Sequence, residues 1–181
     1  MQLTRGLLLF GLATAGCASA GRVDTATLPP GLFSSTDVDE AALYEASMTV
    51  GLGGTRPTTV QNWARALAEV DYIAGAFNTR TRWIGLDALA QEDLLIARQE
   101  VRDVIGIPRD TPSQQVVDAL LAASRTTDQA QLQSAFSSGI FTLGSSGTIA
   151  RLQNMPAFFT TPYAIARTNK AVYGGISRLT F

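Results

Sequence analysis

The sequence predicts an all-α protein, a bundle of six or seven short-to-medium helices. Residues 60–77 repeat apolar side chains at alternating spacings of three and four, which is the period of a helix buried along one side. Helix start and stop signals recur along the chain, with Ser, Thr or Asp at the starts and Gly or Pro at the ends. Strand-like alternation is absent outside the last six residues, 176–181.

Two helices are expected in the first third of the domain. Asp37 with Glu40 forms a capping box, and this first helix runs to about residue 50, before Gly51. Thr58 with Gln61 opens the second helix. Its apolar stripe consists of Val60, Trp63, Leu67, Val70, Ala74 and Phe77.

A turn at residues 79–86 separates the second helix from the third. The third helix directs Leu89, Leu94, Ala97, Val101 and Val104 inward, and it ends at Gly106, where a left-handed residue is favoured, ahead of Pro108. The fourth begins with Thr111 as its N-cap and Pro112 at the first helical position. Its buried face is Val116, Val117, Leu120 and Leu121.

The last part of the chain predicts three more helices. A short one begins at Thr127 and continues through Leu132 and Phe136. A Gly/Ser-rich loop over residues 139–147 precedes a short helix at 149–155. Thr161 and Pro162 open the final helix, which ends at residues 174–175. No repeat of fixed period occurs, so the pattern does not indicate a solenoid.

The first 17 residues have the layout of an export signal. Arg5 supplies a positive start, an apolar run over residues 7–12 follows, and small residues come next. The segment Thr14-Ala15-Gly16-Cys17 resembles the lipobox of bacterial lipoproteins, although Thr14 stands where that family usually has Leu. The resemblance implies that Cys17 is lipidated and becomes the new N-terminus.

The lipoprotein interpretation divides the chain into a signal (1–17), a flexible tether (18–35) and a single helical domain (36–181). Ala18 follows the cysteine, and by resemblance this implies a lipid anchor on the periplasmic side of the outer membrane. The alternative is ordinary cleavage after Ala20, which would release a soluble periplasmic protein. No later apolar run is long enough for a transmembrane span.

Composition excludes several chemistries. The chain has no histidine and one cysteine, Cys17, so a Ser-His-Asp triad and a thiolate nucleophile in the mature domain are both excluded. The usual ligands of zinc, haem and iron–sulfur centres are missing too, and we expect no metal and no cofactor. The net charge of −1 gives no reason to expect nucleic acid as a partner.

One cluster stands out as a candidate binding site for a ligand or partner. Arg80, Arg82 and Trp83 lie close together at the turn after the second helix. Guanidinium groups beside an indole can hold a carboxylate, a phosphate or a sugar ring. The structural alternative is that the arginines complement the negative end of the helix dipole while Trp83 covers the core.

Carboxylates are the acid–base groups that remain for catalysis. The candidates are Glu45, Glu69, Asp71, Glu92, Asp93, Glu100 and Asp103. Their alternative interpretation is a solvated helix face with pairing between residues four apart. The segment from Gly139 to Ser146 has the outer frame of a phosphate-binding loop but lacks its lysine, and we interpret it as an inter-helix loop.

Three functions fit these observations. The first is a non-enzymatic, lipid-anchored domain that binds or scaffolds an envelope protein, and it predicts an exposed apolar patch beside Arg80, Arg82 and Trp83. The second is a carrier of a small apolar ligand, with a pocket lined by residues such as Trp63, Phe77 and Phe136. The third is a carboxylate-dependent cell-wall hydrolase or lyase, which needs a cleft with a buried Glu or Asp of perturbed pKa.

Overall fold

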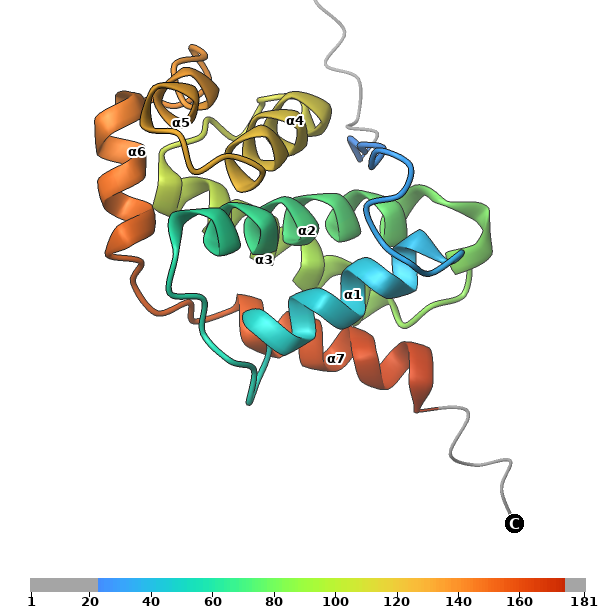
Figure 1. Ribbon diagram of the computed structural model, residues 1–181. Helices are drawn as coiled ribbons and strands as arrows, with labels where there is room; N and C mark the ends of the chain where they lie inside the picture. Colours follow the sequence, from blue (N-terminus) through green and yellow to red (C-terminus); the bar gives the residue numbers. More distant parts are fainter. Residues whose placement is uncertain (1–22, 175–181) are drawn as a thin grey trace, which may run out of the picture.

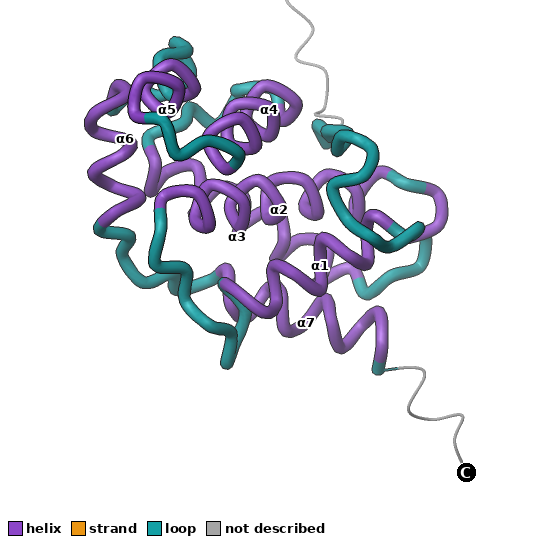
Figure 2. Tube along the Cα trace, viewed as in Figure 1, coloured by secondary structure: helices purple, strands orange, loops and turns teal. Residues whose placement is uncertain are grey.

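A computed structural model describes residues 23–174 of the chain. This range is helical and contains no strand, so the predicted all-α class is confirmed (Figures 1 and 2). The α-helices are α1 (Val38–Thr49), α2 (Val60–Thr79), α3 (Ala88–Ile105), α4 (Ser113–Ser124), α5 (Gln129–Ala135), α6 (Gly144–Gln153) and α7 (Thr161–Tyr173). A 3-10 turn, η1 (Thr81–Trp83), follows α2. Cys17 and the strand-like segment 176–181 lie outside the described residues.

Helix α2 is the centre of the fold. It packs against α1, α3, α4 and α6, while α7 packs on α3 and α1 (Figure 1). Between residues 63 and 77 all but one of the α2 residues are buried, including Glu69 and Asp71. The predicted apolar stripe of α2 is therefore buried, but the opposite face of the helix is buried as well. Among the described residues, no helix is both long enough and apolar enough to cross a membrane.

Local signals place the ends of the first three helices. The Asp37 carboxylate accepts a hydrogen bond from the Glu40 amide at 3.1 Å and begins α1 as predicted. Thr59, one residue after the predicted Thr58, caps α2 by accepting from the Asn62 amide at 3.1 Å. Gly106 ends α3 with a φ of 73°, in the left-handed conformation that glycine adopts without strain.

Helix α5 is capped by Asp128, one residue after the predicted start at Thr127. The starts of α4 and α7 differ from the prediction because their caps come from distant parts of the chain. At α4 the N-cap residue is Pro112 rather than Thr111, and the Ser113 amide donates to the carboxylate of Asp24. At α7 the predicted cap Thr161 is the first helical residue. The carboxylate of Glu100, on α3, accepts from the Phe159, Thr160 and Thr161 amides and from the Thr161 hydroxyl.

Helix α6 begins at Gly144, so the predicted loop at 139–147 is shorter than expected. The Thr142 amide and hydroxyl both donate to the Gly106 carbonyl, at 2.8 and 2.7 Å, and fix where the chain enters this helix. This tertiary contact overrides the weak helix propensity of the Gly/Ser stretch. On α3, Leu89 is exposed rather than inward, whereas Leu94, Ala97 and Val101 are fully buried as predicted.

The non-helical segment before α1 packs against the helices from residue 23 onward. Ala26 is buried, and the side chain of Gln114 on α4 accepts from the Thr27 amide at 2.8 Å. The Asp24 carbonyl accepts from Arg98 on α3 at 3.0 Å. The predicted tether at 18–35 therefore has its second part seated on the domain, and its first residues, 18–22, lie outside the described range.

Candidate functional site

The structure brings Arg80, Arg82 and Trp83 together where η1 meets the start of α1. Asp39, which is fully buried, accepts hydrogen bonds from Arg80 at 2.6 Å and from the Trp83 indole nitrogen at 3.0 Å. The Tyr72 hydroxyl donates to the same carboxylate at 2.6 Å. Burial raises the pKa of this phenol strongly, and the bond to Asp39 raises it further. Asp39 thus ties α1 to α2 and to the turn.

Arg82 makes the second set of contacts in this cluster. It forms ion pairs with Asp37 and Glu40, the latter at 3.0 Å, and its guanidinium lies 4.3 Å from the centre of the Trp83 ring. Trp83 in turn stacks on Phe77 at 4.3 Å. Both arginines therefore contact carboxylates of α1 or its cap rather than the C-terminal carbonyls of α2. A ligand here would compete with these ion pairs, and the site stays a prediction.

Helix α1 exposes apolar side chains on the face that points away from the core. Tyr44 and Met48 lie four residues apart on this face and are 59% and 51% exposed. Leu52, in the turn that follows, is 54% exposed. On the inner side of the same helix Ala42, Leu43 and Ala46 are fully buried. We call Tyr44, Met48 and Leu52 the α1 apolar face.

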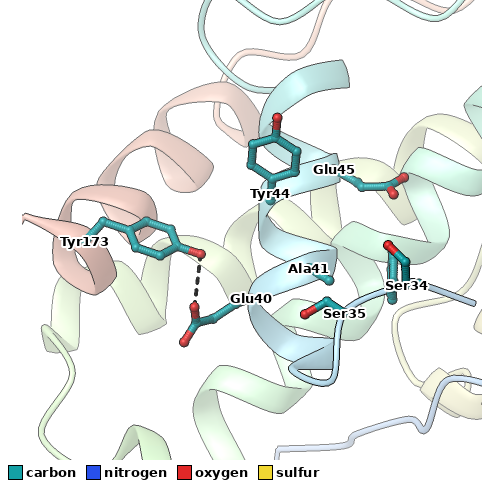
Figure 3. A pocket seen from close by; sticks show the side chains of 8 residues that line it. Ser34, Ser35, Glu40, Ala41, Tyr44, Glu45 and Tyr173 are labelled. Atoms are coloured by element: carbon teal, nitrogen blue, oxygen red, sulfur yellow. Dashed lines mark hydrogen bonds between the residues drawn. The ribbon is translucent and has the colours of Figure 1, made fainter.

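A shallow pocket of about 480 Å³ adjoins the α1 apolar face. In Figure 3, Tyr44 extends from α1, with Glu40 and Tyr173 to one side and Glu45, Ser34 and Ser35 to the other. The Tyr173 hydroxyl lies 3.5 Å from Glu40 and closes one end of the pocket. Burial and the nearby Glu40 carboxylate raise the pKa of Tyr173. The pocket thus combines aromatic rings with carboxylates and hydroxyl groups.

A second pocket, of about 380 Å³, lies on the other side of Glu45 between α1, α2 and the loop at residues 55–58. Glu69 lines this pocket from α2, and its side chain is 1% exposed. One of its carboxyl oxygens is ion-paired with Arg65, one helical turn earlier. Arg65 also lies 3.6 Å from Glu45, so this arginine links the two glutamates.

Burial raises the pKa of Glu69 from 4.5 to about 7, because the ion pair with Arg65 does not compensate for the lost hydration. The negative charge of Glu45 raises it further. Both Glu69 and Asp71 are buried, so the alternative interpretation of these two acids as part of a solvated helix face is wrong. A buried carboxyl of perturbed pKa in a pocket is the feature that the hydrolase hypothesis requires, and catalysis itself stays a prediction.

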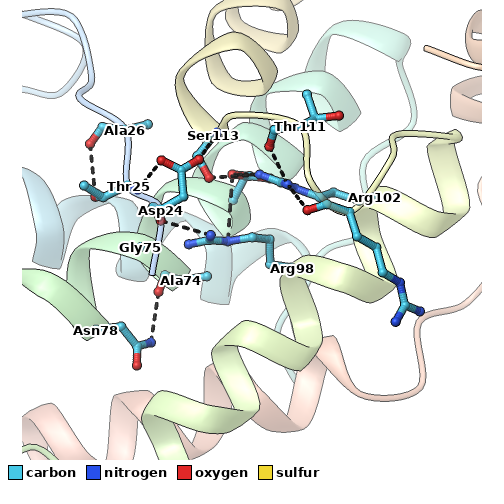
Figure 4. Close-up of polar contacts among 12 residues, drawn as sticks. Asp24, Thr25, Ala26, Ala74, Gly75, Asn78, Arg98, Arg102, Thr111 and Ser113 are labelled. Carbon is cyan, nitrogen blue, oxygen red and sulfur yellow. Dashed lines mark hydrogen bonds and ion pairs between the residues drawn. The ribbon is translucent and has the colours of Figure 1, made fainter. Parts of the chain in front are cut away.

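Asp71 belongs to a buried ion-pair cluster that joins four segments. Arg102 binds both oxygens of Asp71, at 2.7 and 3.0 Å, and Arg98 lies 3.9 Å from the same carboxylate. Arg102 also donates to the Thr111 carbonyl and the Ser113 hydroxyl at the start of α4 (Figure 4). Desolvation lowers the pKa of Arg98. These groups hold α2, α3, α4 and Asp24 together, which is a structural role.

Most of the other predicted acids have structural partners. Glu100 caps α7, and although burial opposes its ionisation, hydrogen bonds from Thr161 and from the amides of residues 159–161 hold its pKa below its usual range. Asp93 pairs with Arg167 at 2.6 Å, and Asp103 pairs with exposed Arg109 at 2.9 Å. Glu92 is exposed on α3.

The residues expected to line an apolar ligand cavity fill the core instead. Phe77 stacks on Trp83, Trp63 packs edge-on against Phe158 with 6.1 Å between ring centres, and Phe136 does so against Phe141 at 5.1 Å. These contacts give the carrier hypothesis no support.

The segment at residues 139–146, which has the outer frame of a phosphate-binding loop, is only partly a loop. Helix α6 begins within it, at Gly144.

The sequence indicates Glu69 as a candidate acid but not its burial, and it does not lead to a prediction of the α1 apolar face. For the face, the signal was present: Tyr44, Met48 and Leu52 recur every four residues, opposite Leu43 and Ala46. Large apolar side chains on the outer side of a helix whose inner side is already buried favour a binding surface. Comparison of the chain with models of known families, with curated proteins and with solved structures gives no match.

Proposed function

We propose that the helical domain binds a protein partner through the α1 apolar face, in the bacterial envelope where a lipid on Cys17 anchors it. The observation that carries this proposal is the exposure of Tyr44, Met48 and Leu52, each more than half accessible, on a helix whose inner side is already buried. Contiguous apolar patches on a folded domain mark interaction surfaces, and Tyr is enriched at the energetic centres of interfaces.

The charges beside this face indicate what kind of partner it fits. Glu40 and Glu45 flank it, but each is close to an arginine, Arg82 at 3.0 Å and Arg65 at 3.6 Å. Arg82 is also paired with Asp37, and Arg65 with Glu69, so each arginine is shared between two acids and the rim keeps a small excess of negative charge. We therefore expect a partner whose contact surface is mainly apolar with basic rather than acidic groups at its edge, and binding that depends only weakly on salt.

Photo-crosslinking in the native host tests this proposal. A photoreactive residue placed at position 44, 48 or 52 should give adducts with one and the same partner protein, and Met48→Asp should remove them without lowering the unfolding temperature. Gln133, which is exposed on α5, is the matched control position and should give no such adduct. Equal adducts at position 133, or adducts only between two copies of this chain, would contradict the proposal.

The envelope anchor has its own test. Intact-mass analysis of the mature protein from the native host should show a gain the size of a diacylglyceryl group, lost in Cys17→Ala. An unmodified chain that begins at Gly21 would contradict the lipid anchor and favour a soluble periplasmic protein. That result would leave the proposed binding face in place, so the two parts of the proposal can fail separately.

A further inference from the structure

The pocket between α1, α2 and the loop at residues 55–58 has in its lining a carboxyl oxygen that accepts no hydrogen bond from the described residues. Arg65 pairs with one carboxyl oxygen of Glu69. The other oxygen has no hydrogen-bond partner among the described residues, and it is not one of the fully sequestered polar atoms. A side chain that is 1% exposed thus presents one free oxygen to the pocket. This oxygen is therefore available to accept a hydrogen bond from water or from a ligand in the pocket.

The rim of the pocket consists of neutral polar groups and one more carboxylate. Asn62, Thr55 and Thr58 are exposed there, and together they offer hydroxyl and amide groups that can both donate and accept. Glu45 stands at the boundary with the neighbouring pocket on α1. Such a mixture of donors and acceptors suits a ligand that carries several hydroxyl groups.

Charge balance argues for an uncharged ligand. The pocket contains two arginines, Arg56 and Arg65, and two glutamates. Arg65 is paired with both glutamates, and Arg56 donates to the Met155 carbonyl while it lies 5.0 Å from the Trp63 ring centre. With all four groups ionised the pocket has no net charge, so neither an anion nor a cation gains from entering it.

We propose that this pocket binds a neutral polyhydroxylated molecule, a sugar, with the free carboxyl oxygen of Glu69 and the Asn62 amide holding its hydroxyl groups. Its volume of about 380 Å³ lies within the range of small-molecule sites. The α1 apolar face is a separate surface, and this inference does not depend on the proposed protein partner.

Nuclear magnetic resonance titration of the purified full-length chain tests this assignment with probes of matched size. Glucose and N-acetylglucosamine are neutral, glucosamine is cationic and glucuronate is anionic. At a pH above 7, where Glu69 is ionised, at least one neutral sugar should shift the signals of residues 55–69 saturably. Both charged sugars should bind more weakly than that one.

Variants make the test specific to the pocket. Asn62→Ala removes an exposed amide and should weaken binding of the neutral sugar about fivefold, the effect of one hydrogen bond. Glu92→Gln, an exposed acid on α3, is the control and should leave binding unchanged. Glu69→Gln keeps a hydrogen-bonding group but leaves the pocket one positive charge in excess, so it should keep neutral-sugar binding and admit glucuronate.

Either of two results would overturn the assignment of the site, and a third would overturn its charge preference. One is the absence of saturable shifts in residues 55–69 with both neutral sugars. The other is binding of a neutral sugar that Asn62→Ala and Glu92→Gln leave equally strong. Tighter binding of glucosamine or glucuronate than of either neutral sugar would also contradict it, because the charge argument would then be wrong.

Discussion

At the scale of single residues, Asp39 does the most to define the structure around the predicted Arg80, Arg82 and Trp83 site. Its buried carboxylate accepts from Tyr72, Arg80 and Trp83, which come from α2 and the turn after it. Nothing in the sequence around Asp39 distinguishes it from its neighbours Asp37 and Glu40. Its partners lie more than 30 positions away, so only the fold reveals the contact.

Asp39→Ala should lower the free energy of unfolding by about 3 kcal/mol, because it leaves a guanidinium, an indole N–H and a phenol without their shared acceptor. Chemical denaturation measures this effect. Asp110→Ala, at an exposed position, is the control and should change stability by less than about 0.5 kcal/mol. A loss as small as that of the control would mean that Asp39 is not the hub described above.

Glu69 predicts a distinct pH dependence of stability. Its pKa is about 7 in the folded protein and near 4.5 when exposed, so between these values the folded state holds a proton that the unfolded state releases. Raising the pH through this window therefore favours unfolding, by up to about 3 kcal/mol in total. As the pH rises past the folded pKa of about 7, the folded state also releases its proton and this contribution levels off.

Glu69→Gln isolates this contribution, since glutamine does not titrate. The difference in unfolding free energy between the wild-type protein and the variant should change steadily from pH 4.5 to pH 7, with the wild type losing relative stability as the pH rises. Parallel curves across that window would show that the pKa of Glu69 is not raised.

At the scale of helices, local sequence predicts the starts whose caps are local. Asp37 caps α1 within a four-residue window, and Gly106 ends α3 in the left-handed conformation that the Gly-Ile-Pro sequence indicates. The first amides of α4 donate to the carboxylate of Asp24, about 90 positions away. Those of α7 donate to the carboxylate of Glu100, about 60 positions away. A pattern that spans a few residues cannot identify such caps.

Helix α2 shows that apolar periodicity does not predict how much of a helix is buried. Its apolar stripe is real, but the alanines between the stripe residues let neighbouring helices approach from other sides as well. The interpretation of Glu69 and Asp71 as part of a solvated face fails because they lie in the most buried helix of the described chain. The alanine content of α2 was the available signal, because a helix without a polar face is usually surrounded.

Glu100→Ala should release the start of α7. The amides of residues 159–161 would lose their shared acceptor, and loss of a helix cap costs about 1 to 2 kcal/mol. Amide hydrogen exchange should become faster in the first turn of α7 while α2 stays protected. Glu92→Ala, at an exposed position on the same helix as Glu100, is the control and should leave amide hydrogen exchange in α7 unchanged. If exchange in α7 is unchanged in both variants, Glu100 does not cap this helix.

At the scale of the whole molecule, the segment before α1 is part of the folded unit. Ala26 is buried against the helices, and Asp24 contributes a backbone acceptor to Arg98 and a carboxylate to the start of α4. Composition predicted a tether here, because the segment is small, polar and contains two prolines. Such residues also occur in an extended segment that binds to a domain through its backbone groups. Composition alone does not distinguish such a segment from a flexible tether.

Deleting residues 18–28 should therefore lower the unfolding temperature. The lost cap and buried contacts are worth about 2 kcal/mol, which corresponds to roughly 4 to 8 °C for a chain of this size. Thermal unfolding followed by circular dichroism measures this shift. A shorter deletion of residues 18–22 is the control and should have little effect; equal unfolding temperatures for both deletions would assign residues 23–28 to a tether after all.

The central claim, that the α1 apolar face is covered by a partner in the cell, is tested most directly by hydroxyl-radical footprinting. Leu52 and Leu143 are the same residue type with similar exposure, 54% and 41%, and Leu143 lies before α6, away from α1. In the purified protein Leu52 should label at least as fast as Leu143. In intact cells labelling of Tyr44, Met48 and Leu52 should fall severalfold relative to Leu143, whereas an unchanged ratio of Leu52 to Leu143 would contradict the account.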